Sequence, residues 1–347
     1  MNVLVTGGLG YLGSWVVPKL LARGHGVRVL DKDFFSTGSN DPVLSKIELI
    51  REDVREVCHS RAFLQRLVED CDGIIHLAAL SNDPSANLNP AVTWEINYKP
   101  TVTLARRARD LGIPFVFSST CAVYGAGAEE GLLTEESPCN PLTVYAETKY
   151  EAENALRALA TRSWGPRILR NGTLFGYSRR MRFDLVVNLF ALDAQTRRRV
   201  TVFGTGGQYR PHLHVRDAAA AMVHFLLEPS WDRTVVIVGH ENLTVRELTE
   251  ILQGLDPAVE VVDRDGTDED RRNYRVDTTE LRRSGFVPEY TVRMGLAEVA
   301  EAVAGGVIPD PESICYRNVK WLRRLMEDAC SLMGTAPAAA AGDLVAH

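Results

Sequence analysis

The chain has 347 residues, of which 45% are hydrophobic and 24% are charged, a composition typical of a folded globular protein. This length permits two domains, or one large domain with an appended lobe. The formal net charge of −6 argues against binding of nucleic acid over a broad surface. The sequence contains no apolar run of about 18 residues, and its first residues lack the layout of a signal peptide. We therefore expect a cytoplasmic protein that contacts neither nucleic acid nor a membrane.

The six cysteines form no C-x-x-C pair and show no spacing typical of a metal site. Cysteines used in this way are typical of reduced intracellular thiols. We therefore expect no bound metal.

Short apolar runs typical of buried strands alternate with segments of helical periodicity through the first half of the chain. The expected strands span 2–6, 27–30, 47–50, 73–79, 115–118 and 167–170, and the expected helices span 14–23, 63–68, 92–110 and 145–160. Strands separated by single helices form right-handed βαβ units, which build a parallel sheet with helices on both faces. The pattern predicts an α/β fold with a doubly wound parallel sheet of the Rossmann type.

After about residue 175 the alternation loosens, and helices expected over 183–197, 245–255 and 292–304 are joined by loops rich in Gly, Arg and Asp. We expect a Rossmann domain over 1–175, to which later segments return, and a smaller α/β lobe over 176–333. This lobe should cover the carboxyl edge of the sheet, where such folds bind ligands. The biased composition of 334–347 predicts a flexible tail.

A glycine-rich turn joins the first expected strand to the first expected helix. It reads Thr6-Gly-Gly-Leu-Gly-Tyr-Leu-Gly13, and glycines at this spacing let backbone N–H groups approach a pyrophosphate at a helix N-terminus. Asp31 ends the second strand, where a carboxylate accepts hydrogen bonds from an adenosine ribose and repels a 2′-phosphate. The turn and Asp31 therefore predict a dinucleotide site that prefers NAD to NADP. Asp53, after the third strand, is either an acceptor for the adenine edge or a solvated loop carboxylate.

A tyrosine and a lysine lie on one face of the helix expected over 145–160. Tyr145 and Lys149 are four residues apart, and Thr120 follows a neighbouring strand. A nearby ammonium should lower the pKa of the tyrosine, so that its phenolate removes a hydroxyl proton. The Thr120 hydroxyl can hydrogen-bond the reacting oxygen. This set of groups suits the oxidation of an alcohol by a bound dinucleotide.

Six segments within about residues 1–305 resemble, in their order along the chain, the extended short-chain dehydrogenase/reductase family, specifically its NAD-dependent nucleotide-sugar epimerases and dehydratases. They are TGGLGYLG, HLAAL, FSSTCAVYG, YAETK, RNGTLFG and RPHLHVRD. The resemblance implies a catalytic trio of Thr120, Tyr145 and Lys149. It implies an NAD site formed by Gly7, Gly10, Tyr11, Leu12, Gly13, Asp31, Asp53, Val54, Leu77, Ala78, Ala79, Ser118, Tyr145 and Lys149. It also implies that a nucleotide-diphosphate sugar is bound by Ser81, Asp83, Thr120, Thr173, Asn188, Arg210 and Arg272, with the two arginines on the diphosphate.

The same resemblance implies a homodimer, in which the helices at about 92–110 and 145–160 pair with their copies as a four-helix bundle. The residues expected on the outward faces of these helices are Leu104, Ala108, Ala152, Leu156 and Leu159.

The sequence departs from the pattern of this family at three places. Thr173 stands where the family often has asparagine, and Arg210-Pro-His-Leu-His-Val215 replaces the common R-D-F-I-H-V. The sugar 4,6-dehydratases carry Asp-Glu after the catalytic threonine, whereas here Cys121 and Ala122 follow it. Alanine cannot transfer a proton, and we expect Cys121 to be a small core thiol.

Together these residues predict an NAD-dependent nucleotide-sugar epimerase that acts at C4 through a transient 4-keto sugar. Three alternatives remain open: an NAD(P)H-dependent 4-keto-sugar reductase, a nucleotide-sugar dehydratase, and a non-catalytic NAD-binding regulator. The sequence leaves the nucleotide base and the sugar undetermined.

Overall fold

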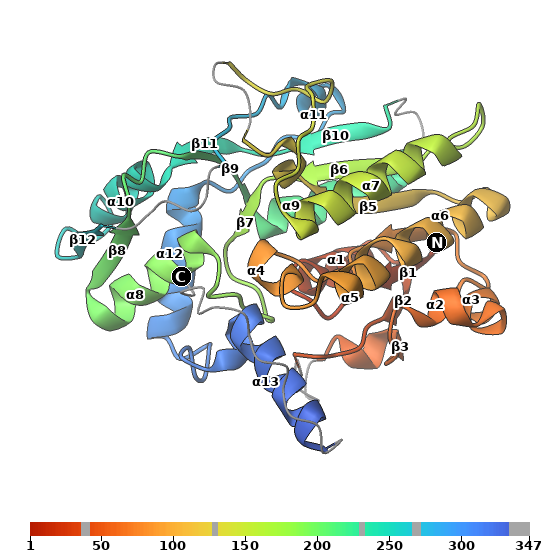
Figure 1. Cartoon of the computed structure of the whole chain (residues 1–347), viewed down its shortest axis with the longest axis horizontal. Coiled ribbons are helices and arrows are strands. Elements are labelled where there is room, and N and C mark those ends of the chain that lie inside the picture. Colours follow the sequence, from red (N-terminus) through yellow and green to blue (C-terminus); the bar gives the residue numbers. More distant parts are fainter. Residues whose placement is uncertain (36–41, 127–130, 229–232, 266–271, 333–347) are drawn as a thin grey trace.

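The computed structural model describes residues 1–35, 42–126, 131–228, 233–265 and 272–332. Figure 1 shows a central sheet with helices on both faces and a smaller lobe to its left. Among the described residues, no helix is both long enough and apolar enough to cross a membrane. The tail expected over 334–347 lies outside the described residues.

Seven parallel strands form the central sheet, and they run in the order β10-β6-β5-β4-β1-β2-β3. They are β1 (Asn2–Thr6), β2 (Gly26–Leu30), β3 (Glu48–Ile50), β4 (Gly73–His76), β5 (Phe115–Thr120), β6 (Arg167–Asn171) and β10 (Val235–Val238). The chain therefore starts in the middle of the sheet and winds outward in both directions, which confirms the predicted Rossmann-type fold. The sequence analysis missed β10, which comes from the second half of the chain and pairs with β6.

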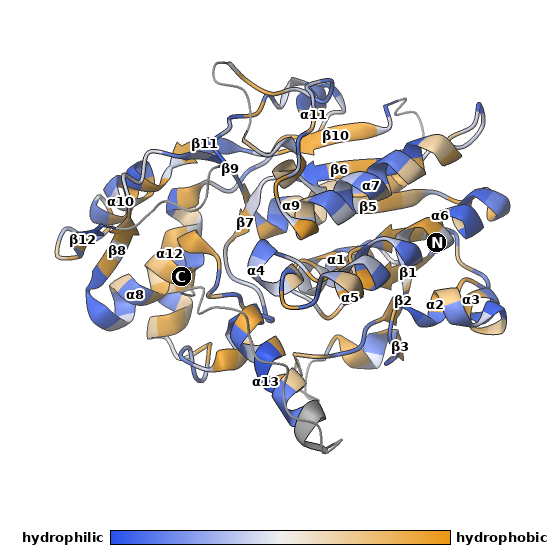
Figure 2. Cartoon of the chain, in the orientation of Figure 1, coloured by the Kyte–Doolittle hydropathy of each residue, from blue (hydrophilic) through white to orange (hydrophobic). Residues whose placement is uncertain are grey.

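Helices cover both faces of this sheet. They are α1 (Gly13–Ala22) and α9 (Val215–Leu227) on one face, and α5 (Pro90–Asn97), α6 (Lys99–Leu111) and α7 (Val144–Leu159) on the other, next to the shorter α2 (Glu56–His59) and α3 (Arg61–Leu67). Successive side chains of a strand point to opposite faces, so Val3 and Val5 join the apolar layer beneath α1, whereas Leu4 joins the layer beneath α6. Figure 2 shows β5 and β10 as largely hydrophobic, as expected for strands buried on both faces.

The smaller lobe contains two further sheets and several helices. Its elements are β7 (Thr173–Phe175), β9 (Tyr209–His214) and β11 (Glu241–Thr244) in one sheet, the parallel pair β8 (Arg199–Phe203) and β12 (Glu260–Arg264), and the helices α8 (Val186–Arg197), α10 (Val245–Gln253) and α12 (Val292–Ala304). Two helices outside these groups, α4 (Asp83–Ala86) and α11 (Thr279–Arg283), are short. The last helix, α13 (Asn318–Leu332), was not predicted, and it contacts α4.

The structure corrects two details of the predicted helices. The helix expected over 92–110 is two helices, α5 and α6, which meet at Tyr98 because Pro100 lies in the first turn of α6. Four of the five residues expected on the outward dimer face, Leu104, Ala108, Ala152 and Leu156, are 0% exposed within the chain itself. They belong to the core beneath the sheet, so the outward faces of α6 and α7 carry other residues.

Candidate active site

A cavity of about 2300 Å³ lies at the carboxyl ends of the central strands, beneath the smaller lobe. Its walls include the glycine turn, the residues that follow β2 and β4, the end of β5, the start of α7, and parts of the lobe. Nearly all the residues that the sequence analysis assigned to a cofactor or a substrate line this one cavity.

The glycine turn between β1 and α1 has no room for side chains at its two ends. Gly7 has a φ of +72°, and a Cβ on it would lie 2.7 Å from the backbone nitrogen of Ala78. A Cβ on Gly13 would collide with the carbonyl oxygen of Gly7. Bare backbone at the first turn of a helix is the arrangement that accepts a pyrophosphate, so this turn fits NAD.

Asp31 lies directly after β2 and lines the cavity. Its Oδ2 accepts a hydrogen bond from the backbone N–H of Leu9 (2.9 Å), and its Oδ1 accepts one from Asp33 (2.8 Å). Burial raises the pKa of this carboxyl group, while the two backbone hydrogen bonds oppose the rise. The structure therefore holds an acceptor in a fixed place beside the glycine turn, as the ribose of NAD requires.

The remaining predicted cofactor residues also border the cavity, namely Gly10, Tyr11, Leu12, Asp53, Val54, Leu77, Ala78, Ala79 and Ser118. Two of them have their polar groups engaged within the protein. The hydroxyl of Tyr11 donates to the carbonyl oxygen of Gly176 (2.5 Å), which ties the glycine turn to the segment after β7. Burial opposes ionisation of Asp53, but hydrogen bonds from the Arg55 guanidinium (2.8 and 3.0 Å) outweigh it and lower the pKa of this carboxyl group.

The predicted catalytic trio comes together at the end of β5 and the start of α7. The ammonium of Lys149 is buried, donates to the carbonyl oxygen of Ser118 (2.8 Å) and lies 4.6 Å from the centre of the Phe117 ring. Thr120 ends β5 and shares a hydrogen bond with Tyr145. A phenol, a hydroxyl and an ammonium therefore lie along one wall of the cavity.

The pKa values in this trio differ from the sequence-based expectation. Burial raises the pKa of Tyr145 to about 12, and the carboxylate of Asp83 adds to the rise. The groups that oppose this rise in the pKa of Tyr145 are Arg182, the Thr120 hydroxyl and Arg272. Lys149, which the sequence indicated for this role, is not among them. Burial lowers the pKa of Lys149 itself to about 7.

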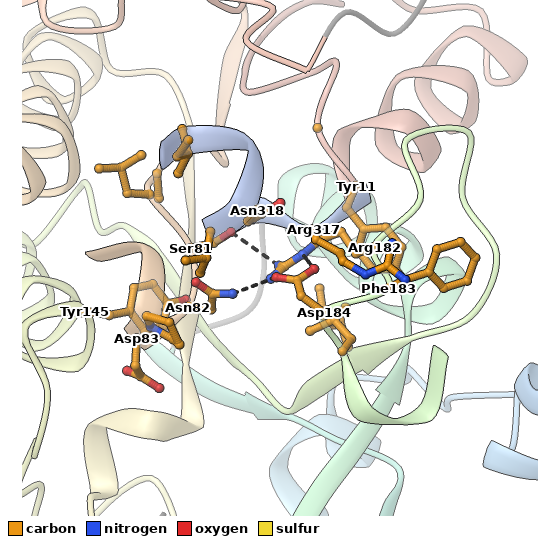
Figure 3. Close-up of a pocket in the computed structure, with 18 of the residues that line it drawn as sticks. Tyr11, Ser81, Asn82, Asp83, Tyr145, Arg182, Phe183, Asp184, Arg317 and Asn318 are labelled. Atoms are coloured by element: carbon orange, nitrogen blue, oxygen red, sulfur yellow. Dashed lines mark hydrogen bonds and ion pairs between the residues drawn. The ribbon is translucent and has the colours of Figure 1, made fainter. Parts of the chain in front are cut away.

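Three polar residues that the sequence analysis did not single out line the cavity opposite Tyr145. Figure 3 shows Arg182 and Asp184 facing the side of the cavity that holds Tyr145, with Ser81 and Asn82 between them. Arg182 makes two hydrogen bonds to Asp184 (2.7 and 3.0 Å) and one to the Ser81 hydroxyl (3.3 Å). The side-chain amide of Asn82 donates to Asp184 (2.7 Å). The backbone of Asn82 has a φ of +89°, which is rare for any residue other than glycine.

The charged run RRMRFD between β7 and α8 is the sequence signal that could have indicated Arg182 and Asp184. Charged residues directly after a strand end often face the ligand site of such a sheet. Asn82 had no comparable signal, because its unusual backbone conformation is visible only in the structure.

The two predicted diphosphate arginines approach each other from different segments of the lobe. Arg210, on β9, donates to the carbonyl oxygens of Tyr209 (2.8 Å) and Arg272, and its guanidinium lies 5.6 Å from the Tyr274 ring centre. Arg272 forms an ion pair with Asp83 (2.7 Å), whose other oxygen accepts a hydrogen bond from Thr143. The structure thus brings both arginines and Asp83 to the same part of the cavity.

Thr173, at the start of β7, lines the cavity, but Asn188 does not. Asn188 is 0% exposed, its amide oxygen accepts from Gly176, and its amide nitrogen donates to Tyr11 and to the carbonyl oxygen of Arg182. All of its hydrogen-bonding groups are used within the protein, so the structure does not bring it to the predicted substrate site. Cys121 is also buried and points its thiol at the carbonyl oxygen of Arg170 (3.2 Å).

Comparison with protein families gives a match over most of the chain. The sequence model of the NAD dependent epimerase/dehydratase family matches residues 3–239. The chain is 28% identical over 309 residues to a putative UDP-glucose 4-epimerase of Methanocaldococcus jannaschii, an alignment that covers 86% of this chain and 96% of that protein. It is also 29% identical over 311 residues to UDP-glucuronic acid decarboxylase 4 of Arabidopsis thaliana, which covers 85% of this chain and 67% of that protein.

A solved structure supports the same assignment. The dTDP-glucose 4,6-dehydratase from Streptomyces venezuelae, whose structure contains NAD, superposes with a TM-score of 0.74 at 27% identity, covering 88% of this chain and 98% of that one. The names of these three proteins cover epimerisation, dehydration and decarboxylation of nucleotide-linked sugars.

Proposed function

The chain belongs to the NAD-dependent epimerase/dehydratase family, and we propose that it inverts a nucleotide-linked hexose at C4. The observation that carries this proposal is the composition of the wall around Thr120. The proton-transfer groups needed at C4 are present there, whereas the residue pair needed for elimination of water is replaced by Cys121 and Ala122.

The chain's own residues supply the proton transfers of this reaction. Tyr145, ionised to the phenolate, takes the proton of the 4-hydroxyl group, and the Thr120 hydroxyl hydrogen-bonds the same sugar oxygen and holds it near Tyr145. Arg182 provides positive charge near this proton as it moves. NAD held by the glycine turn and Asp31 would supply a hydride acceptor and donor for C4. The 4-keto sugar must turn within the cavity between the two hydride transfers, so that the hydride returns to its opposite face. Tyr145 then gives its proton back to the oxygen at C4, so that the inverted sugar and the starting form of the enzyme result.

Elimination has little support from the residues after Thr120. Ala122 lines the cavity but carries no group that could donate or accept a proton. Cys121 does not line it, and burial raises the pKa of its thiol far above the neutral range. A dehydration across C5 and C6 needs an acid and a base at this place. Their absence from these two positions favours a reaction that stops at the 4-keto sugar and reverses.

The nucleotide part of the substrate is assigned to the lobe side of the cavity. We propose that Arg210 and Arg272 hold its diphosphate, because both line the cavity from separate segments and the Arg210 guanidinium donates to the backbone carbonyl oxygen of Arg272. The Arg182–Asp184 pair and Ser81 face Tyr145 across the cavity and are placed to hydrogen-bond the hydroxyl groups of the sugar (Figure 3).

The test is to incubate the purified protein with a panel of UDP- and dTDP-linked hexoses and UDP-glucuronic acid, without added cofactor, and to identify the products by NMR. We expect one hexose to equilibrate with its C4 epimer, and the Tyr145→Phe variant to form this epimer at least about 10²-fold more slowly. A 4-keto-6-deoxy sugar would indicate a dehydratase, and a pentose with release of CO₂ would indicate a decarboxylase. Consumption of added NADH or NADPH with a nucleotide-linked 4-keto sugar as substrate would indicate a reductase. Each of these three results would overturn the proposal.

A further inference from the structure

One face of the last helix, α13, forms part of the wall of the cavity. Besides Asn318 and Lys320, the residues of α13 that line the cavity are Val319, Leu322, Arg323, Met326 and Glu327. Residues spaced by three and four positions lie on one face of a helix, so these five make a continuous stripe. The apolar members at the centre of the stripe are not packed into the core, and Met326 is 45% exposed.

Two contacts attach the beginning of α13 to the segment that follows Asp31. The indole N–H of Trp321 donates to the carbonyl oxygen of Phe34 (2.5 Å). Arg180, which is 4% exposed, donates to the side chain of Asn318 and lies 3.6 Å from the centre of the Phe35 ring. These contacts hold the stripe close to Asp31, the predicted acceptor for the adenosine ribose.

On the other side α13 contacts α4, the short helix that begins at Asp83. The helix therefore reaches from the residues after β2 to the residues after β4, and both groups line the same cavity. The glycine turn and α13 therefore both belong to the wall of this cavity.

We propose that the Val319–Leu322–Met326 stripe of α13 packs on the adenosine half of bound NAD and slows its release. We assign the adenosine half of NAD to this stripe because the stripe borders the same cavity as Asp31, Asp53 and Val54, the predicted adenosine-binding residues. An adenine ring offers a flat apolar face, and burial of Leu322 and Met326 against it would remove their exposed surface from water. A cofactor held in this way suits a reaction that regenerates NAD at each turnover, but the inference concerns binding and does not depend on which reaction follows.

The test compares NAD release from four full-length variants and the parent protein. Leu322→Ser with Met326→Ser removes the apolar stripe, and Trp321→Phe removes the hydrogen bond to Phe34 while it keeps an aromatic ring. The matched control is Val287→Ser with Val307→Ser, which changes two exposed apolar side chains (60% and 57%) that do not line the cavity. Release is followed as exchange of bound NAD for isotopically labelled NAD, and circular dichroism checks that each variant is folded.

We expect the stripe variant to release NAD at least about tenfold faster, which corresponds to about 1.4 kcal/mol. Trp321→Phe should show a smaller increase, and the control should match the parent. Asp31→Asn serves as a variant that weakens NAD binding through the ribose. If Asp31→Asn accelerates release and the folded stripe variant does not, α13 has no part in the NAD site and the inference is wrong. It is also wrong if the stripe variant loses affinity for a nucleoside diphosphate and retains NAD normally, because α13 would then cover the substrate.

Discussion

The carboxylate of Asp83 and the guanidinium of Arg272 form an ion pair with an N–O distance of 2.7 Å at the wall of the cavity. Asp83 belongs to α4, beside the central sheet, whereas Arg272 belongs to the lobe segment before α11. Both residues are proposed to contact the substrate, one through the sugar and the other through the diphosphate. A diphosphate held by Arg272 must therefore share this guanidinium with Asp83 or displace it.

The ion pair leads to opposite expectations for its two members. Arg272→Ala should weaken the binding of a nucleoside diphosphate about 10- to 150-fold, because a hydrogen bond to a charged group contributes roughly 1.5–3 kcal/mol. Arg210→Ala should have a similar effect. Asp83→Asn removes the competing negative charge and should leave this binding unchanged or tighten it a few-fold. Isothermal titration calorimetry with UDP and dTDP measures all three variants.

The matched control for these arginines is Arg109→Ala, which removes a guanidinium on the surface of α6 that pairs with Asp110. NAD affinity should stay near the parent value in every variant, since the pyrophosphate of NAD is assigned to the glycine turn. Parent-like UDP and dTDP affinity in both Arg210→Ala and Arg272→Ala would contradict the proposed diphosphate site.

The proposed acid–base role of Tyr145 predicts a selective loss in Tyr145→Phe. Turnover should fall about 10²- to 10⁴-fold, the range typical of general acid–base groups, while NAD binding changes little because the ring is kept. Steady-state kinetics and NAD titration give the two readouts. Tyr98→Phe, which alters a tyrosine that does not line the cavity, is the control. Comparable rates in both variants would show that another residue transfers the proton.

The buried His76 makes the folded state sensitive to acid. Its Nδ1 and Nε2 are hydrogen-bonded to Thr6 (2.6 Å) and Thr101 (2.8 Å), and burial lowers the pKa of its ring from 6.5 to about 3. The unfolded state therefore binds more protons between pH 6.5 and pH 3, and the stability that the neutral ring provides is lost as the pH falls through this window. The loss amounts to about 1.4 kcal/mol for each pH unit.

Urea unfolding at pH 6.5 and pH 5 measures this effect. Between these two values the parent protein should lose about 2 kcal/mol more stability than His76→Gln, which cannot take up a proton there. His59→Gln, which alters an exposed histidine, should keep the pH dependence of the parent. An identical slope for the parent and His76→Gln would contradict the neutral, buried state of this ring.

The parts of the site that could be predicted are those whose residues lie close together in the sequence. The glycine turn and the Tyr145–Lys149 spacing are local patterns, and the structure places both at the wall of the same cavity. The charged run RRMRFD is a local signal for Arg182 and Asp184, but their contact with Asn82 joins segments about 100 residues apart, so no local pattern reveals the whole cluster. The raised pKa of Tyr145 depends on how deeply the folded chain buries the phenol, which spacing alone does not determine.

The same limit applies to the fold. The order of strands and helices predicted the parallel sheet, but β10 has only four residues and reaches the sheet from the far half of the chain. Leu104 and Ala152 were assigned to the outward faces of their helices, although they pack beneath the sheet. Their position depends on the rotation of each helix against its neighbours.

The homodimer remains a prediction, now with different contact residues. The exposed side chains of α6 include Arg106, and those of α7 include Glu147 and Glu151, so an α6–α7 four-helix bundle would bring opposite charges together. Light scattering at micromolar concentration should give twice the chain mass, and Glu151→Arg should shift the protein towards the monomer. A monomer mass for the parent protein would contradict the predicted dimer.

The reaction at C4 is tested most directly with UDP-glucose and dTDP-glucose that carry deuterium on C4. An enzyme that takes the C4 hydride and returns it to the same carbon keeps the label there, so NMR should show the C4 epimer with deuterium still on C4. Migration of deuterium to another carbon, loss of deuterium to water, or the absence of any epimer would contradict epimerisation at C4.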